Sequence, residues 1–398
     1  MSRETEKINF LAGVQVGNVI YFSAWNVNGL FTYNPRTEEC RFLKSFPGEE
    51  NWGLHSEAVL YGNTIWFIPR ASERIAIVEL DDLQISYLDL PESGYRPKDC
   101  NIPPRRMTGC HKEGDRYLWL LPKAYKLFLK IDMEERQILD VQEWGTADFA
   151  DAVGIRVQDK LWVTIGSTRE LRVIDLISEK QTVQKMQQKD ALYMGMQKAD
   201  GRVYLFPQYA KDGVLILDHT MQEMGIVSLD DDGQWYYEYG AITGEGDLLL
   251  IPYSGSRCVR VGMDGHSCLI KEMIDLDVGK SAYCSSSMVV DDQIWFLSHV
   301  TENPLICYDR QQGVFSYRHI EMPCERYYGE ILDVAVQYGL EYSPLYTKRE
   351  FSESRFALNQ FISFVKQIEC EKIMEADRKI GEEIYRVIGK EAHEKAGN

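Results

Sequence analysis

An apolar triplet, usually with an aromatic residue at its centre, returns along most of this chain at a nearly constant interval. The copies are "IYF" at 20–22, "IWF" at 65–67, "LWL" at 118–120, "LWV" at 161–163, "VYL" at 203–205, "LLL" at 248–250 and "IWF" at 294–296. Their first residues lie 45, 53, 43, 42, 45 and 46 positions apart. Self-similarity at such a period indicates one structural unit that the chain uses repeatedly.

The residues around each triplet repeat as well. A turn-forming pair precedes it, such as Gly17-Asn18 or Gly62-Asn63, and such pairs tolerate the positive φ angles of tight hairpins. A second apolar strand follows and ends in Asn or Asp, at positions 34, 81, 132, 175, 218, 264 and 309. A more alternating strand, such as "CRFLKSF", comes last. Each unit therefore predicts a four-stranded antiparallel meander.

The middle strands of each unit are apolar at nearly every position, which is typical of strands buried on both faces. One meander cannot cover two apolar faces alone, and radial stacking of seven closes a ring. We therefore predict an all-β domain over 1–322, a seven-bladed β-propeller of four-stranded antiparallel blades. The blades are expected at about 7–47, 54–91, 105–144, 148–188, 190–230, 236–275 and 280–322. Prolines after four triplets should end the second strand of their blades; they are Pro69, Pro122, Pro207 and Pro252.

Two hairpins resemble kelch-type propeller repeats. "FTYNPRTEECRFL" at 31–43 has the aromatic, Asn, Pro and Thr of the kelch hairpin between third and fourth strands, and "CYDRQQGVFSY" at 307–317 is a looser match. The resemblance extends over about 9–322 and implies the propeller fold without a particular function. The Gly-Gly pair typical of kelch second strands is absent, so the chain would be a divergent member.

Residues 323–398 form a C-terminal extension with a different pattern, expected to be mostly helical from 352. One apolar stripe runs at helical spacing through Phe361, Val365, Ile368, Ile373, Ala376, Ile380, Ile384 and Val387. Ser352 or Ser354 can cap the start of the helix. Either the stripe docks on the propeller flank, or residues 352–389 contact a partner or a second copy.

Charge excludes some partners. The chain of 398 residues has a net charge of -17 and no Lys/Arg cluster, which argues against nucleic acid and against an anionic membrane surface. The N-terminal residues lack the apolar core of a signal peptide, and no run is long enough for a membrane helix, so we expect a cytoplasmic protein.

The nine cysteines contain no C-x-x-C pair. We interpret them as reduced core residues, and the alternative is a reactive thiol at Cys110 or Cys284. A bacterial origin is our guess.

Aromatic and basic residues gather in the loops that should form one face of the ring. Rings beside polar groups suit peptide or sugar contacts. The ligand-binding candidates are Trp25, Asn26, Trp52, Arg70, Arg105, Arg106, Tyr193, Trp235, Tyr237, Tyr253 and Tyr283. The alternative for each ring is packing between blades. Arg105 and Arg106 belong to the longest inter-blade loop, 91–110, which could also be a solvated insertion.

An enzymatic hypothesis rests on four residues expected at the central face: His55, Glu57, His111 and His299. His55 and Glu57 are two residues apart on an inner strand, so both side chains should point the same way. "WFIPRASERIAIV" at 66–78 resembles the repeat of virginiamycin-lyase-like propellers, which implies a histidine and a carboxylate acting with Mg, although the acidic repeat motif of that family is missing. No P-loop, G-x-S-x-G or H-E-x-x-H motif occurs.

These observations favour a non-catalytic scaffold that recognises a peptide, a protein or a glycan on its loop face. Surface-carbohydrate assembly is our hypothesis for the process that it serves. No metal site and no cofactor are predicted for such a protein. The alternative is a lyase or hydrolase, with or without the assistance of a metal, because propellers carry both kinds of function.

Overall fold

The computed structural model describes residues 5–323, with gaps at 26, 50–52, 93–106, 123–126, 144–151, 166–169, 187–192, 200, 208–211, 230–235, 265–266, 279–280 and 299–303. The chain divides into two compact units, residues 1–344 and 345–398. The helix predicted from 352 onward lies outside the described residues, so it and the domain boundary at 322 stay predictions.

Seven four-stranded antiparallel sheets follow one another along the chain, each made of consecutive strands. Blade 1 contains β2 (Phe10–Val16), β3 (Val19–Ala24), β4 (Leu30–Asn34) and β5 (Glu39–Lys44), and blade 2 contains β6 (His55–Tyr61), β7 (Thr64–Pro69), β8 (Arg74–Glu79) and β9 (Ile85–Asp89). Blade 3 contains β10 (Met107–Glu113), β11 (Tyr117–Pro122), β12 (Leu127–Asp132) and β13 (Gln137–Glu143). Blade 4 contains β14 (Ala152–Val157), β15 (Lys160–Ile165), β16 (Glu170–Asp175) and β17 (Gln181–Lys185).

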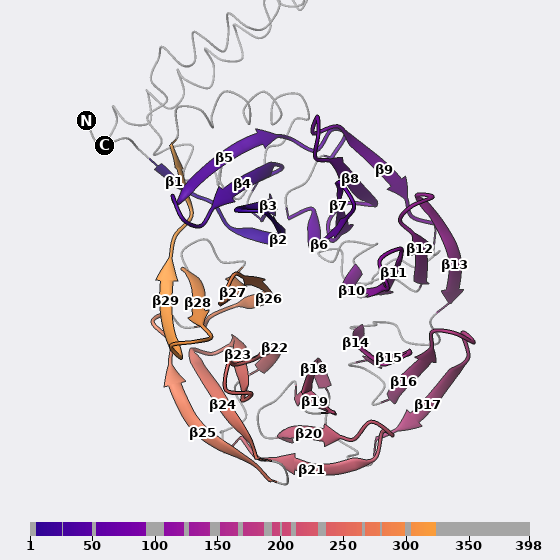
Figure 1. The fold of residues 1–398 in the computed structure, drawn as a ribbon, viewed down its shortest axis with the longest axis vertical. Helices are drawn as coiled ribbons and strands as arrows, with labels where there is room; N and C mark the ends of the chain where they lie inside the picture. Colours follow the sequence, from indigo (N-terminus) through magenta and orange to yellow (C-terminus); the bar gives the residue numbers. More distant parts are fainter. Residues whose placement is uncertain are drawn as a thin grey trace, which may run out of the picture. The chain divides into compact units, whose positions relative to one another are not determined.

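Blade 5 contains β18 (Tyr193–Ala199), β19 (Arg202–Pro207), β20 (Val214–Leu217) and β21 (Glu223–Val227), and blade 6 contains β22 (Tyr236–Ile242), β23 (Leu248–Ser254), β24 (Arg257–Asp264) and β25 (Ser267–Asp275). Blade 7 contains β26 (Cys284–Val290), β27 (Gln293–Ser298), β28 (Leu305–Asp309) and β29 (Val314–Arg318). Figure 1 shows the blades arranged in a ring, with the first strand of each nearest the centre. The predicted seven-bladed β-propeller is therefore confirmed.

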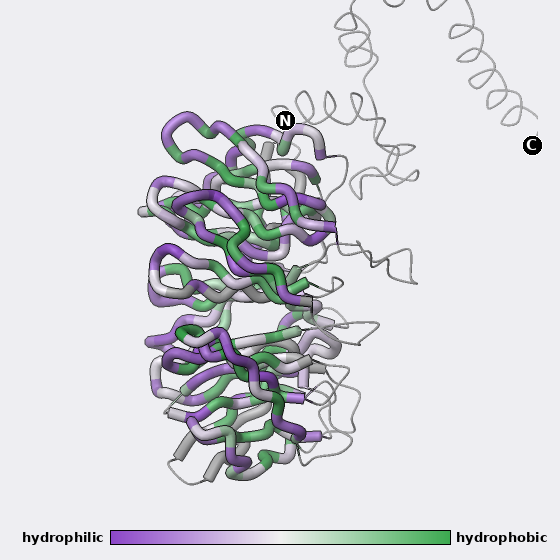
Figure 2. The backbone as a smooth tube through the Cα atoms, turned by 90° about the vertical axis from the view of Figure 1, so that its right-hand side faces the viewer, coloured by the Kyte–Doolittle hydropathy of each residue, from purple (hydrophilic) through white to green (hydrophobic). Residues whose placement is uncertain are grey.

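The core consists of apolar layers between neighbouring blades. In β7, Ile65 and Phe67 pack in the layer with blade 1, whereas Trp66 and Ile68 pack in the layer with blade 3. Successive side chains of a strand point to opposite faces, so β7 is buried on both faces. In Figure 2 the hydrophobic stretches lie within the sheets and hydrophilic turns follow one edge of the ring.

A repeated side-chain contact shapes the turn between the third and fourth strands. In blade 1, Asn34 Oδ1 accepts hydrogen bonds from the backbone N–H groups of Arg36 (3.0 Å) and Thr37 (3.4 Å). Asp132, Asp175, Asp218 and Asp309 accept equivalent backbone bonds in blades 3, 4, 5 and 7. Asn and Asp stabilise turns in this way, which explains why one of them lies at or directly after the end of the third strand in these five blades.

The blade-ending prolines agree with the prediction in three blades and differ in one. Pro69, Pro122 and Pro207 are the last residues of β7, β11 and β19. In blade 6, β23 continues through Pro252 to Ser254. Its partner strand changes register twice beside this proline, between Tyr236 and Tyr237 and again between Tyr237 and Tyr239. These shifts accommodate a residue that cannot donate to the ladder.

Ring closure uses a separate two-stranded sheet. β1 (Thr5–Lys7) pairs antiparallel with β30 (Glu321–Pro323), with Lys7 opposite Glu321. Beside it, Ser286 Oγ in blade 7 donates to the Leu11 carbonyl at 3.0 Å. No blade is completed by a strand from the other end of the chain, because every four-stranded sheet is continuous in sequence.

The meander topology defines two sides of the ring. The loop face carries the connections between second and third strands and between consecutive blades, and the turn face carries the tight hairpins. Trp25, Gly53, Arg70 and Tyr283 lie in connections of the loop face, and Tyr253 is the second-last residue of β23. Among the described residues, no helix has the length and apolar character needed to span a bilayer.

Candidate functional site

The structure describes only part of the predicted site. Six candidates lie outside the described residues: Asn26, Trp52, Arg105, Arg106, Trp235 and His299. His111 lies in β10, opposite Trp119 of β11, and only its backbone is described. The remaining candidates separate into a pair at blades 1 and 2, an aromatic pair at blades 6 and 7, and residues of the core.

Trp25 and Arg70 form a stacked pair on the loop face. Trp25 follows β3 of blade 1 and Arg70 follows β7 of blade 2, and the Arg70 guanidinium carbon lies 4.1 Å from the indole centroid. Both side chains are half-buried. A cation over the face of a tryptophan is held by the negative potential of the ring. The fold thus joins two candidates that are separated by a whole repeat.

Gly53 makes room for this pair. Its φ is +57°, in the left-handed region that favours glycine. A Cβ at this position would lie 2.8 Å from Cε3 and Cζ3 of Trp25 and 3.3 Å from Nη1 of Arg70. Both the backbone conformation and the close approach of the indole therefore require glycine here. Gly53 was not among the residues predicted from the sequence, although its place between Trp52 and an inner strand was a signal.

The backbone that carries Arg70 is fixed by three convergent hydrogen bonds. The N–H groups of Arg70, Ala71 and Ser72 all donate to the Leu54 carbonyl, at 2.7, 3.1 and 3.1 Å. The Ser72 hydroxyl is buried and donates to Glu49 Oε1 at 2.9 Å. Ser72 is thus a structural residue, whereas Arg70 projects its side chain over Trp25.

Glu49 connects the loops of blades 1 and 2 beneath this surface. Its side chain is buried and receives Nη2 of Arg74 at 3.0 Å, while its carbonyl accepts a bond from Asn28 Nδ2 at 2.8 Å. Burial raises the pKa of the Glu49 carboxyl, and the hydrogen bonds from Ser72 and Arg74 oppose this rise. The network holds the loop that precedes blade 2 against the loop that carries Arg70.

His55 lies inside the fold rather than in an open site. Its ring is buried and packs against Phe46 and Phe67, at centroid distances of 4.5 and 5.2 Å. Nδ1 lies 2.8 Å from Ser23 Oγ, and Nε2 is buried without a hydrogen-bond partner among the described residues. Burial lowers the pKa of His55 to about 3. A neutral, enclosed imidazole does not suit acid–base catalysis on a bound ligand.

A β-bulge also separates His55 from Glu57. His55 is opposite Pro69 and Glu57 is opposite Ile68, so Ser56 is an extra residue in β6. Pro69 and Ile68 are adjacent on β7, and adjacent residues point to opposite faces. The expectation that His55 and Glu57 share a face is therefore wrong. The same register shift occurs near the start of the first strand in most blades, namely in β2, β10, β18, β22 and β26.

The tyrosine candidates divide by burial. Tyr193 and Tyr237 are fully buried core residues, and burial raises the pKa of Tyr193. Tyr253 and Tyr283 are half-buried and meet edge to face, with ring centroids 5.9 Å apart. The Tyr283 N–H donates to the Tyr253 carbonyl at 2.9 Å. Tyr253 and Tyr283 thus form an aromatic pair, in addition to the Trp25–Arg70 stack.

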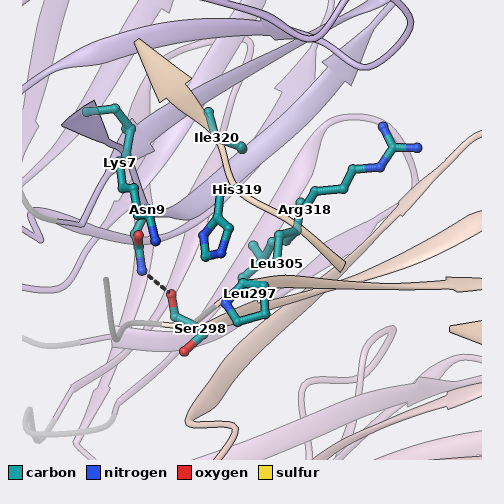
Figure 3. A pocket seen from close by; sticks show the side chains of 10 residues that line it. Lys7, Asn9, Leu297, Ser298, Leu305, Arg318, His319 and Ile320 are labelled. Atoms are coloured by element: carbon teal, nitrogen blue, oxygen red, sulfur yellow. Dashed lines mark hydrogen bonds between the residues drawn. The ribbon is translucent and has the colours of Figure 1, made fainter. Parts of the chain in front are cut away.

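A small cavity lies at the closing seam of the ring (Figure 3). Its volume is about 20 Å³, room for one water-sized group. Figure 3 shows the His319 ring beside Asn9, whose Nδ2 donates to the Ser298 carbonyl at 3.0 Å. Partial burial and then the charge of Lys7 lower the pKa of His319. The cavity is too small for a ligand fragment, so we interpret it as part of the seam.

In the part of the chain that the structure describes, possible metal ligands are dispersed and the described thiol side chains are buried. No three His, Cys, Asp or Glu side chains among these residues are grouped to hold a metal ion. Cys40, Cys258, Cys284 and Cys307 are buried thiols. Burial raises the pKa of Cys40 and of Cys307 to about 12, and that of Cys284 as well. A thiol with a raised pKa is a poor nucleophile.

Comparison with known proteins agrees on the fold. Neither a protein-family model nor a curated protein sequence matches the chain. A catalytically inactive virginiamycin B lyase from Staphylococcus aureus, solved with quinupristin, superposes with a TM-score of 0.59 at 11% identity, covering 75% of this chain and 97% of that one. U3-55K gives a TM-score of 0.54 at 12% identity, covering 74% and 91%. A chain of the mitotic checkpoint complex gives 0.55 at 6% identity, covering 74% and 88%.

At such low identities these likenesses define the class of protein only. The chain is a seven-bladed β-propeller protein, and its similar structures include both an enzyme and a member of a protein complex. Function therefore has to be argued from the residues of its own loop face.

Proposed function

We propose that this propeller is a binding module and that its loop face holds a peptide segment of a partner protein. The observation that carries the proposal is the Trp25–Arg70 stack. Gly53 leaves room for the indole, and the Leu54 carbonyl accepts the hydrogen bond that holds the Arg70 backbone. Tryptophan and arginine are enriched among the residues that dominate protein interfaces, because they combine apolar area with directed hydrogen bonds. A rigid pair loses little conformational entropy when a ligand binds.

Two further observations support binding over catalysis. His55, the best-described residue of the enzymatic hypothesis, is buried and keeps a pKa of about 3. Cys40, Cys284 and Cys307, the thiols in the same part of the chain, are buried and have raised pKa values, which disfavours a cysteine nucleophile among them.

The proposal is tested by selecting a displayed library of random peptides on the full chain. We expect a family of related peptides whose affinity falls at least tenfold for Trp25→Ala, because truncating a central interface aromatic costs about 2 kcal/mol or more. Arg41→Gln is the matched control, since Arg41 lies on the outer strand β5 and is exposed. Failure to enrich any peptide, or equal binding by Trp25→Ala, contradicts the proposal.

Several finer expectations stay predictions from the sequence. They are the kelch-like affiliation, the glycan as an alternative ligand, the cytoplasmic location, the bacterial origin and the partner contact through 352–389. The contributions of Asn26, Trp52, Arg105, Arg106 and Trp235 to the binding face belong with them.

A further inference from the structure

We infer that the outer edge of blade 4 is a second interaction surface, which takes an extended segment of a partner protein as a fifth strand beside β17. The inference is independent of the loop face. It starts from the distribution of exposed apolar side chains. Among the described residues, six of the eight large apolar side chains that are exposed lie on the outer strands of blades 3, 4 and 5 or in the turn before β17: Leu139, Val141, Ile177, Val183, Met224 and Ile226.

Ile177 is the clearest member of this set, because the fold does not require an apolar residue there. It lies two residues after Asp175 in the turn between β16 and β17, and its N–H donates to Asp175 Oδ1 at 3.1 Å. The same backbone bond occurs in four other blades, where it is made by exposed polar residues: Arg36, Glu134, Thr220 and Gln311. The turn thus forms equally well with a polar residue, yet Ile177 is 79% exposed. Such a residue favours a contact outside the chain.

The backbone of β17 is suited to the addition of a strand. β17 is the outermost strand of blade 4 (Figure 1), and in the described part of the chain it pairs with β16 alone. Its five residues pair with β16 without a register shift, whereas β13 and β21 on the neighbouring blades are each bulged. Bulges and prolines protect a sheet edge from pairing with another chain, and β17 has neither. A regular edge that exposes Val183 is therefore a template for an added strand.

The charges beside this edge indicate which segment fits it. Lys180 and Lys185 are exposed at the two ends of β17. Glu179, the acid next to them, pairs with Lys130 of blade 3, with Oε1 3.0 Å from Nζ. The edge is thus locally basic, although the whole chain has a net charge of -17. A segment with an apolar centre and an acidic residue beside it complements this edge.

A second copy of the chain fits the edge less well than a segment of another protein. Each copy has a net charge of -17, so two copies repel each other. The rim of the ring is also convex (Figure 1), so two rings side by side would meet along one strand. Such a contact supplies little of the roughly 800 Å² per partner that a stable interface buries. An extended segment can instead follow β17 and the turn at Ile177.

The experiment selects a displayed library of random peptides on the full chain, after depletion on the double variant Ile177→Thr/Val183→Thr. Ile177→Thr gives this turn the residue that blade 5 has at Thr220, so we expect its unfolding midpoint to equal that of the unchanged protein. The selected peptides should have alternating apolar residues with an Asp or Glu beside them. Their affinity should fall about tenfold for Ile177→Thr, because binding buries the isoleucine side chain.

Two variants serve as controls for this selection. Val314→Thr makes the same kind of change at a valine of β29 that is 50% exposed, and it should bind the selected peptides like the unchanged protein. Trp25→Ala should also bind them without loss, because the loop face is not involved.

A synthetic consensus peptide tests the added strand itself. In a strand, the amide N–H groups of alternate residues point to the same side. N-methylation of one alternate set should therefore weaken binding at least tenfold, while N-methylation of the other set should leave it nearly unchanged. An equal effect of the two sets would mean that the peptide does not pair with β17, and this would overturn the inference.

The remaining outcomes separate this inference from the proposed function. Failure to enrich peptides that depend on Ile177 and Val183 overturns the inference and leaves the Trp25-dependent peptides of the loop face unaffected. If sedimentation of the unchanged protein shows dimers that Ile177→Thr abolishes, the occupant is a second copy and the partner segment is overturned. If Ile177→Thr unfolds more readily than Val314→Thr, the two methylated peptides on the unchanged protein decide alone.

Discussion

Single residues at the junction of blades 1 and 2 have distinct tasks although they are close in sequence. Gly53 admits Trp25 and Arg70, and Leu54 supplies the carbonyl that fixes the Arg70 backbone. Next to them, His55 turns inward between two phenylalanines. Three consecutive residues thus provide a gap, an acceptor and a core contact. Their neighbours in space, together with their chemical type, decide these tasks.

His55 should make the stability of the propeller dependent on pH. Its pKa is about 3 in the fold against an ordinary value of 6.5, so below pH 6.5 the unfolded chain binds a proton that the folded protein does not. Stability therefore falls as the pH drops from about 6.5 toward 3. We expect His55 to contribute a loss of about 2 kcal/mol between pH 7 and pH 5.

Urea unfolding of the unchanged protein and of His55→Gln at pH 7, 6 and 5 measures this effect. The difference in unfolding free energy between the two proteins should change by about 2 kcal/mol between pH 7 and pH 5. His219→Gln is the control, because His219 is exposed. Parallel pH profiles for the unchanged protein and His55→Gln would show that His55 is not buried in its neutral form.

At the scale of the element, the same strand position has different surroundings in different blades. Trp66, Trp162 and Trp295 occupy the centre of the repeated triplet and are buried. The Trp66 and Trp295 indoles donate to Thr64 Oγ1 and Gln293 Oε1, each at 3.0 Å. Trp162 Nε1 is buried and has no acceptor in the described part of the chain. A buried donor without a partner costs free energy, so the three tryptophans are not equivalent.

Trp162→Phe should therefore be tolerated better than Trp66→Phe. Both substitutions remove the same atoms from a buried layer, but only the second breaks a hydrogen bond. We expect the loss of unfolding free energy to be smaller for Trp162→Phe by about 1 kcal/mol. Chemical denaturation of both variants and of Trp295→Phe, which should behave like Trp66→Phe, measures the difference. An equal or larger loss in Trp162→Phe would mean that its N–H is satisfied in solution.

At the scale of the whole molecule, the ring closes by a strand pair and by specific side-chain contacts. Every blade is complete in itself, and β1 and β30 join the two ends of the propeller. Next to this sheet, Gln15 Nε2 donates to Asp291 Oδ1 at 3.1 Å and Ser286 Oγ to the Leu11 carbonyl. Arg318 of blade 7 reaches the Pro35 carbonyl of blade 1 at 3.3 Å. Closure thus depends on a side-chain seam as well as on the strand pair.

Deletion of residues 1–7 should weaken the ring without opening it. The deletion removes β1, while the bonds of Ser286 and Gln15 across the seam remain. We expect a single cooperative thermal transition with a lower midpoint and a loss of about 2 kcal/mol, the value of a few exposed backbone hydrogen bonds. Ser286→Ala in the deleted chain should lower it further. A transition split in two would show that β1 and β30 are essential for closure.

The sequence alone determined the repeat, the strand order and the number of blades. These features are local, because alternation of side chains, turn residues such as Asn34 and strand-ending prolines act within one hairpin. The triplets and the Asn or Asp near the end of the third strand therefore predicted the four-stranded units correctly. Trp25 and Arg70 could be assigned to loops for the same reason, whereas Tyr193 and Tyr237, which were expected in loops, belong to strands β18 and β22.

Only the tertiary structure decided which loop residues meet. Trp25 and Arg70 come from different blades, and their contact depends on how two sheets stack and on the glycine between them. The bulge at Ser56 turned His55 into the core, against the expectation from simple alternation. Contacts between blades follow from packing in three dimensions, which a repeat of the chain does not encode residue by residue. The sequence thus defined the ring, and the stacking of the blades defined its candidate site.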